Sequence, residues 1–119
     1  MKKSNILIAE DEESLRDTWS LMLAHFDCTV HLASNGQEAI DIINQNEIEV
    51  VVTDLQMPIK DGYFVLDHLH SCDKKITTWV CTGELSPSTD LEQFKIDKIV
   101  HKPFDMLQTV QELIALVKD

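Results

Sequence analysis

Five polar side chains of this sequence could act on one substrate if the fold brings them together, and they are Glu10, Asp11, Asp54, Thr82 and Lys102. Three of them are carboxylates. Two carboxylates about 4 Å apart repel each other by roughly 4 kcal/mol at an effective dielectric of about 20, so such a cluster holds a proton or binds a cation. Oxygen ligands suit a hard divalent ion, and Mg²⁺ usually keeps several waters on sites of this kind.

An acidic pocket that holds a divalent cation can accept a phosphoryl group that the bare pocket would repel. Asp54 would then be the nucleophile, as in other reactions that form an aspartyl phosphate. The Lys102 ammonium would offset the negative charge that builds up on the phosphoryl oxygens, and the Thr82 hydroxyl would donate a hydrogen bond to one of them. These residue types therefore predict phosphoryl transfer onto Asp54.

Each of these residues follows or ends an apolar run, and such runs alternate with helical patterns along the chain. The runs predict strands at 6–9, 29–32, 50–52, 76–81 and 99–100. Apolar residues at helical spacing predict helices within 15–26, 39–43, 64–69 and 107–117. Ser86-Pro87 is typical of one more helix start, and Ser34 and Gln37 stand at capping-box spacing before the second helix.

Apolar strands separated by helices imply a parallel sheet that is covered on both faces, which predicts a doubly wound α/β sandwich of three layers. In such a sheet the functional site lies beyond the carboxyl ends of the strands, near the point where the strand order reverses. We therefore expect the polar residues that follow the strands to converge there.

The composition limits what else the protein could be. Its 119 residues suit one compact domain over 1–119. The net charge of −11 repels nucleic acid, so we expect no direct contact with it. The apolar run at 6–9 is too short for a signal peptide, and no stretch approaches a transmembrane helix. Three cysteines without paired spacing indicate a reducing, cytoplasmic location.

Four motifs in this chain, in the right order, resemble those of the response-regulator receiver domains of two-component signalling. Residues 6–12 resemble the acidic-pair opening, and 53–58 with Asp61-Gly62 resemble the phosphoacceptor strand and loop. Thr82-Gly83 resembles the hydroxyl switch position, and Lys102-Pro103-Phe104 resembles the lysine–cis-proline motif. Any one motif alone would be weak, but the combination is highly specific.

The resemblance implies a chemotaxis-regulator-like receiver. Its fold would be a flavodoxin-like sandwich with five strands in the order 2-1-3-4-5 and five helices. Asp54 would accept a phosphoryl group from a phosphohistidine on a sensor histidine kinase or histidine phosphotransfer protein. Asp11, Asp54 and the backbone carbonyl of Gln56 would bind Mg²⁺ directly, while Glu10 would act largely through water.

The same resemblance implies roles for the remaining site residues. Thr82 would move toward the phosphate, Lys102 would bind it, and the Lys102–Pro103 peptide bond would be cis. Gln56 and Glu84 match two positions that tune self-dephosphorylation. The phosphorylated protein would signal to a downstream protein partner through the surface of its fourth helix, last strand and last helix.

Two features depart from the family pattern. Ile99 stands where receivers commonly carry a tyrosine or phenylalanine, so the usual coupling of an aromatic rotamer to the threonine cannot operate in that form. Residues 94–97 stand where a small or glycine residue usually precedes the last strand. We expect modified signalling on the last strand and helix, and a fourth helix that is short or mobile.

Several functions remain open. A stand-alone phosphorylation switch, which catalyses only its own phosphorylation and dephosphorylation and is not a conventional enzyme, fits the full site best. The receiver could instead belong to a longer transcriptional regulator. A degenerate receiver that is never phosphorylated ranks low because all the site residues are present.

Two other classes share parts of the pattern. Aspartyl-phosphate phosphatases typically carry a second acid two residues after the nucleophile, where this chain has Gln56. A flavin-binding electron carrier would need a phosphate-cradling loop after the first strand, where 10–13 are four acids that would repel the phosphate.

Overall fold

Five parallel strands form one sheet in the computed structural model, which describes residues 3–83 and 91–117. The strands are β1 (Ser4–Ala9), β2 (Cys28–Ala33), β3 (Val50–Asp54), β4 (Thr77–Thr82) and β5 (Lys98–His101). Their order is β2-β1-β3-β4-β5, and each neighbouring pair is parallel. The predicted doubly wound fold and strand order are confirmed.

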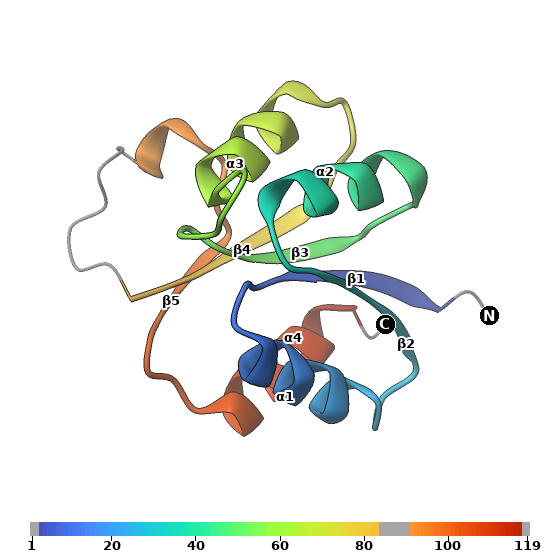
Figure 1. Cartoon of the computed structure of the whole chain (residues 1–119). Coiled ribbons are helices and arrows are strands. Elements are labelled where there is room, and N and C mark those ends of the chain that lie inside the picture. Colours follow the sequence, from blue (N-terminus) through green and yellow to red (C-terminus); the bar gives the residue numbers. More distant parts are fainter. Residues whose placement is uncertain (1–2, 84–90, 118–119) are drawn as a thin grey trace.

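Helices cover both faces of the sheet (Figure 1), with α2 and α3 on one face and α1 and α4 on the other. Their bounds are α1 (Glu13–Leu23), α2 (Gly36–Gln45), α3 (Gly62–Ser71) and α4 (Met106–Val117). None of the helices in the described ranges is long and apolar enough to cross a membrane.

Successive strand residues point to opposite faces of the sheet, and this alternation gives the molecule two core layers. Ile6, Ile8, Val50 and Val52 face α1 and α4, where they pack with Trp19 and Leu113 among others. Leu7, Ala9 and Val51 face α2 and α3 and pack with Ala39, Ile43 and Val65. The side chains on both faces of the central strands are thus buried, which explains why these strands are apolar throughout.

The predicted count of five helices differs from the four α-helices found in 3–83 and 91–117. The helix start at Ser86-Pro87 lies outside the described residues. The chain after it forms only a 3₁₀ turn at Leu91–Gln93. Asp97 then exchanges hydrogen bonds with Thr78, its N–H donating to the carbonyl (2.8 Å) and its Oδ2 accepting from the Thr78 N–H (2.8 Å). This anchor fixes Asp97 beside Thr78, directly before β5 begins at Lys98.

The start of α2 is capped one residue later than the sequence predicts. The N-cap is Asn35, whose side chain accepts from the Glu38 N–H. Glu38 Oε1 in turn accepts from the N–H (2.7 Å) and hydroxyl (2.9 Å) of Ser34. These bonds, from the Ser34 N–H first, lower the pKa of the Glu38 carboxyl below its ordinary value.

A lowered pKa in the folded protein means that the Glu38 cap stabilises the fold above the ordinary carboxyl pKa and that this stabilisation is lost as the pH falls. We expect Glu38→Gln to reduce the free energy of unfolding by about 0.5 kcal/mol near neutral pH, and by less at about pH 3, because the carboxyl becomes protonated as the pH falls through its lowered pKa. Urea unfolding at both pH values measures this. Glu49→Gln is the control, and an equal, pH-dependent loss in that variant would contradict the assignment.

Candidate functional site

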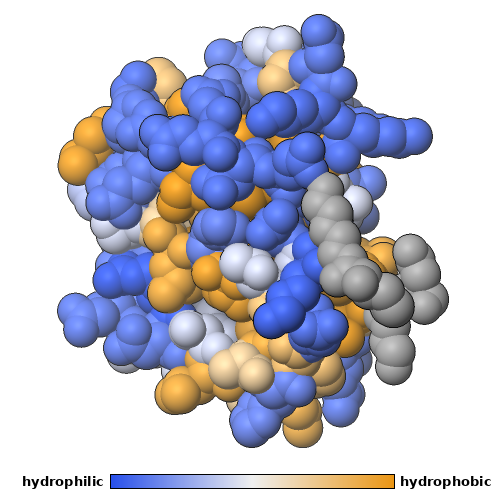
Figure 2. Space-filling model, turned by 90° about the vertical axis from the view of Figure 1, so that its right-hand side faces the viewer, coloured by the Kyte–Doolittle hydropathy of each residue, from blue (hydrophilic) through white to orange (hydrophobic). Residues whose placement is uncertain are grey.

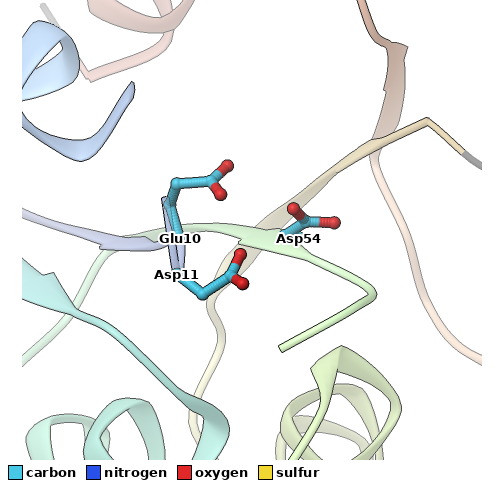
Figure 3. A group of neighbouring side chains, drawn as sticks. All are labelled: Glu10, Asp11 and Asp54. Atoms are coloured by element: carbon cyan, nitrogen blue, oxygen red, sulfur yellow. The ribbon is translucent and has the colours of Figure 1, made fainter. Parts of the chain in front are cut away.

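The carboxyl ends of β1 and β3 bring three acids to one edge of the sheet (Figure 3). Ala9 lies opposite Thr53 in the register of these strands, so Glu10 is level with Asp54. One carboxylate oxygen from each of Glu10, Asp11 and Asp54 lies within 4.8 Å of the other two. The strand order reverses between β1 and β3, so the acids meet where a doubly wound sheet places its site.

Lys102 connects two of these acids from the end of β5. Its Nζ donates to Asp54 Oδ2 at 2.7 Å and to Glu10 Oε1 at 3.0 Å. Both carboxylates are buried, with relative exposures of 7% for Asp54 and 3% for Glu10. One ammonium therefore faces three carboxylates, which leaves the pocket with a formal charge of −2 from these four side chains.

Backbone N–H groups satisfy the remaining oxygens of the buried pair. Glu10 Oε2 accepts from the Glu12 N–H at 3.1 Å, and Asp54 Oδ1 accepts from the Gln56 N–H at 3.2 Å. The exposed carboxylate of Asp11 has no such bond from the described residues. Among the described residues, Asp11 is thus the one acid of the three whose carboxylate accepts no hydrogen bond.

Burial and pairing act against each other on the ionisation of this pocket. Burial raises the pKa of Glu10, although the hydrogen bonds from Lys102 and from the Glu12 N–H oppose it. For Lys102, burial draws the pKa down, but the hydrogen bonds to Asp54 and Glu10 outweigh it, so its pKa lies above the usual value. Lys102 is therefore a cation at neutral pH.

The Asp61-Gly62 pair fixes α3 close to the end of β3. Asp61 Oδ1 caps α3 by accepting from the N–H groups of Tyr63 (3.0 Å) and Phe64 (3.2 Å). A Cβ on Gly62 would lie 2.0 Å from the carbonyl oxygen of Asp54. Only glycine permits this approach, so the motif positions the backbone around Asp54.

The loop after Asp54 contains the one positive φ found in 3–83 and 91–117. Ile59 has a φ of 69°, which is unusual for a β-branched residue, and its side chain is 79% exposed. The next residue, Lys60, accepts a hydrogen bond from the Gly36 N–H at 2.6 Å. The start of α2 thus holds this loop in place.

Backbone groups link Thr82 to Lys102 and Gln56 to Asp54. Thr82 is buried at the end of β4, and its carbonyl accepts from the Lys102 N–H at 2.9 Å. Gln56 is exposed on the loop two residues beyond Asp54. The Lys102–Pro103 bond is cis, as expected. Glu84 lies outside the described residues.

Sequence reasoning missed Arg16, the chain's one arginine. Its Nη1 donates to the backbone carbonyls of Glu10 (2.8 Å) and Asp11 (3.1 Å). Arg16 therefore fixes the turn that presents both acids. The available signal was an arginine one turn into the helix that follows the acidic pair.

Comparison with known proteins decides the family. The family model that describes the response regulator receiver domain matches residues 6–115 of this sequence. This chain belongs to the response-regulator receiver family. The match confirms the resemblance that the sequence motifs indicated. A receiver domain is a signalling switch of two-component systems rather than a conventional enzyme.

Curated relatives of this receiver domain are longer regulators. Response regulator RR06 of Streptococcus pneumoniae is 30% identical over 115 residues, which are 96% of this chain and 53% of the relative. Transcriptional regulatory protein SrrA of Staphylococcus aureus is 29% identical over 97% of this chain and 48% of its own length. The chain spans about half the length of these relatives.

Solved structures support the fold. A CheY-like receiver domain protein from Methanospirillum hungatei aligns with a TM-score of 0.88 at 19% identity, covering 98% of this chain and 94% of that one. A LuxR-family DNA-binding response regulator from Staphylococcus aureus aligns with a TM-score of 0.84 at 24% identity, covering 97% of this chain and 99% of that one. At these identities, the likeness shows the fold alone.

Removing the uncompensated acid of the receiver domain should relieve repulsion in the pocket. We expect Asp11→Ala to raise the free energy of unfolding in chelator by about 1 kcal/mol, the repulsion of charges about 4 Å apart in water. Thermal unfolding measures the change. A clear drop in melting temperature would show that Asp11 is held by structural partners instead.

Proposed function

We propose that this receiver domain takes a phosphoryl group onto Asp54 from a histidine kinase or histidine phosphotransfer protein. The supporting observation is the geometry at Asp54. Its carboxylate is buried at the end of β3, bonded to Lys102 on one oxygen and to the Gln56 N–H on the other, beside two more acids. Glu10 is buried with a similar pair of bonds at the end of β1, so the choice of Asp54 over Glu10 rests on the likeness of residues 53–58 to the phosphoacceptor strand and loop of the family.

The donor set fits Mg²⁺. Three carboxylates offer oxygens within 4.8 Å of one another, and the formal charge of −2 that remains beside Lys102 calls for a divalent ion. Asp11, Asp54 and the Gln56 backbone carbonyl would hold the ion directly, and Glu10 would do so largely through water. Bound there, Mg²⁺ would neutralise the pocket so that a phosphoryl group can approach.

The residues of the chain carry out the transfer. An Asp54 carboxylate oxygen attacks phosphorus, the phosphorus–nitrogen bond of the phosphohistidine breaks, and the imidazole leaves with its electron pair and takes up a proton. Lys102 Nζ, now 2.7 Å from Asp54 Oδ2, moves to a phosphoryl oxygen. The Thr82 hydroxyl donates to another phosphoryl oxygen.

Phosphorylation adds about −1.5 to −2 charges, and β4 and β5 carry its effect because Thr82 and Lys102 lie at their ends. The β5–α4 surface is the proposed readout. Lys98 on β5 forms an ion pair with Glu112 on α4 and lies 4.9 Å from the centre of the Trp79 ring. Ile99, 41% exposed, replaces the aromatic residue common in the family.

A second proposal concerns the output. The matched relatives include a transcriptional regulator about twice as long as this chain, which favours a receiver that controls a DNA-binding domain in the same polypeptide. The stand-alone switch would instead act on a separate protein in the cytoplasm. Sequencing the reading frame beyond codon 119 distinguishes these proposals.

Acetyl phosphate with Mg²⁺ should add one phosphoryl group to the protein, because a small donor needs no docking surface. Intact-mass spectrometry should show the adduct in wild type and in Asp17→Asn, a control that removes an exposed acid from α1. Asp54→Asn should remain unmodified. The same mass gain in Asp54→Asn would overturn the assignment of the acceptor.

A groove beside Lys102 suits the docking of a protein donor. It has a volume of about 420 Å³ and is lined by Leu15 and Thr18 of α1 and by Pro103, Phe104 and Met106. Because it adjoins the lysine that binds Asp54, a donor seated there has its phosphohistidine near the acceptor.

Filling this groove should slow transfer from a protein and spare transfer from a small molecule. We expect Thr18→Arg to slow transfer from a cognate histidine phosphotransfer protein by about tenfold or more, with the acetyl phosphate rate unchanged. Thr29→Arg, on the exposed part of β2, is the matched control. Equal rates for the two variants with the protein donor would exclude the groove as the docking site.

A further inference from the structure

A cavity of about 300 Å³ lies between the end of α3, the start of β4 and the segment before β5. Three lysines line it, Lys74, Lys75 and Lys95, and one acid, Asp73. The whole sequence has only 10 basic residues against 21 acidic ones. Gathering three of the ten around one cavity makes this a local cationic site on a strongly acidic protein.

The cavity lies near the ends at which the strands begin, and the acidic pocket lies at the ends at which they finish. It includes Ile76 and Thr78, near the start of β4, whereas Thr82 ends that strand. A strand of this length spans roughly 15–20 Å, about twice the screening length in physiological salt. An anion near the three lysines is therefore largely screened from the acids around Asp54.

The lysines differ in how far the fold accounts for them. Lys74 Nζ donates to the carbonyls of Ile43 (2.8 Å) and Asn46 (3.5 Å) at the end of α2, where a cation stabilises the helix. Lys75 and Lys95 are exposed and make no ion pair within 3–83 and 91–117. Two ammonium groups on separate segments are thus available to a ligand.

The floor of the cavity is apolar. Leu66, which is 2% exposed, and the partly buried Leu69 and Ile76 line it. His70 forms one wall, and its ring lies edge-on to Phe94 with the ring centres 6.4 Å apart. In Figure 2, which views the end where the strands begin, hydrophilic residues dominate the upper part with hydrophobic ones between them.

We propose that this cavity binds a small molecule that carries a carboxylate or phosphate on a compact apolar body. The apolar floor takes the body, and Lys75 and Lys95 bind the anionic group. A volume of about 300 Å³ is at the lower end of the range for small-molecule sites. The occupant would join the α3–β4 connection to the segment that leads into β5.

Phenyl phosphate is the first probe, titrated into the full chain in chelator and followed by ¹H–¹⁵N correlation NMR. Saturable shifts confined to 66–78 and 94–97 are expected. Benzyl alcohol tests the need for charge and inorganic phosphate the need for the apolar body, and both should bind at least about tenfold more weakly. 3-Phenylpropionate distinguishes a carboxylate ligand from a phosphate ligand.

The double variant Lys75→Glu, Lys95→Glu should weaken phenyl phosphate binding by about tenfold or more. Lys3→Glu, Lys60→Glu makes the same change in net charge elsewhere and should leave the affinity within about twofold. Equal losses in both variants, equal binding of benzyl alcohol, or shifts centred on Asp54 would each overturn the proposal. Lys95→Gln, a milder change in an exposed side chain, keeps the test valid if the charge reversal affects folding.

Discussion

Repulsion between carboxylates held at one edge of a parallel sheet is the constraint on which the rest of this structure depends. The ends of β1 and β3 place Glu10, Asp11 and Asp54 within 4.8 Å of one another, and two of the three are buried. Lys102 compensates part of the charge by bonding to both buried acids. The negative charge that remains favours the binding of a cation, and the proposed phosphorylation would add to that charge.

The fold maintains this unfavourable arrangement through rigid neighbours. Packed apolar layers on both faces of the sheet fix the strand register, while Arg16 holds the turn after β1 and Gly62 lets α3 approach Asp54. The hydrogen bond from the Lys102 N–H to the Thr82 carbonyl joins the end of β4 to the residue that follows β5. In the proposed function, a change in charge at Asp54 would act on β4 and β5 through Thr82 and Lys102 at their ends.

The sequence predicts the acidic cluster because each acid follows an apolar run, and parallel strands end at the same edge of the sheet. It could not predict features that depend on tertiary contacts. The positive φ of Ile59 follows from a loop held by Gly36. The cap at Asn35 competes with an equally plausible one at Ser34. Lys75 and Lys95 are 20 positions apart in the sequence. They line the same cavity only because the fold brings the α3–β4 connection close to the segment before β5.

The central claim is that acids distant in the sequence form one cation site at the end of β3, and paramagnetic Mn²⁺ tests it most directly. Titrated into ¹⁵N-labelled protein at substoichiometric amounts, Mn²⁺ should first broaden the amide signals of 10–12 and 54–57, which lie at the carboxylate cluster. Asp54→Asn should weaken this broadening. Broadening that is centred elsewhere, or that is spread evenly over the exposed acids, would contradict the account.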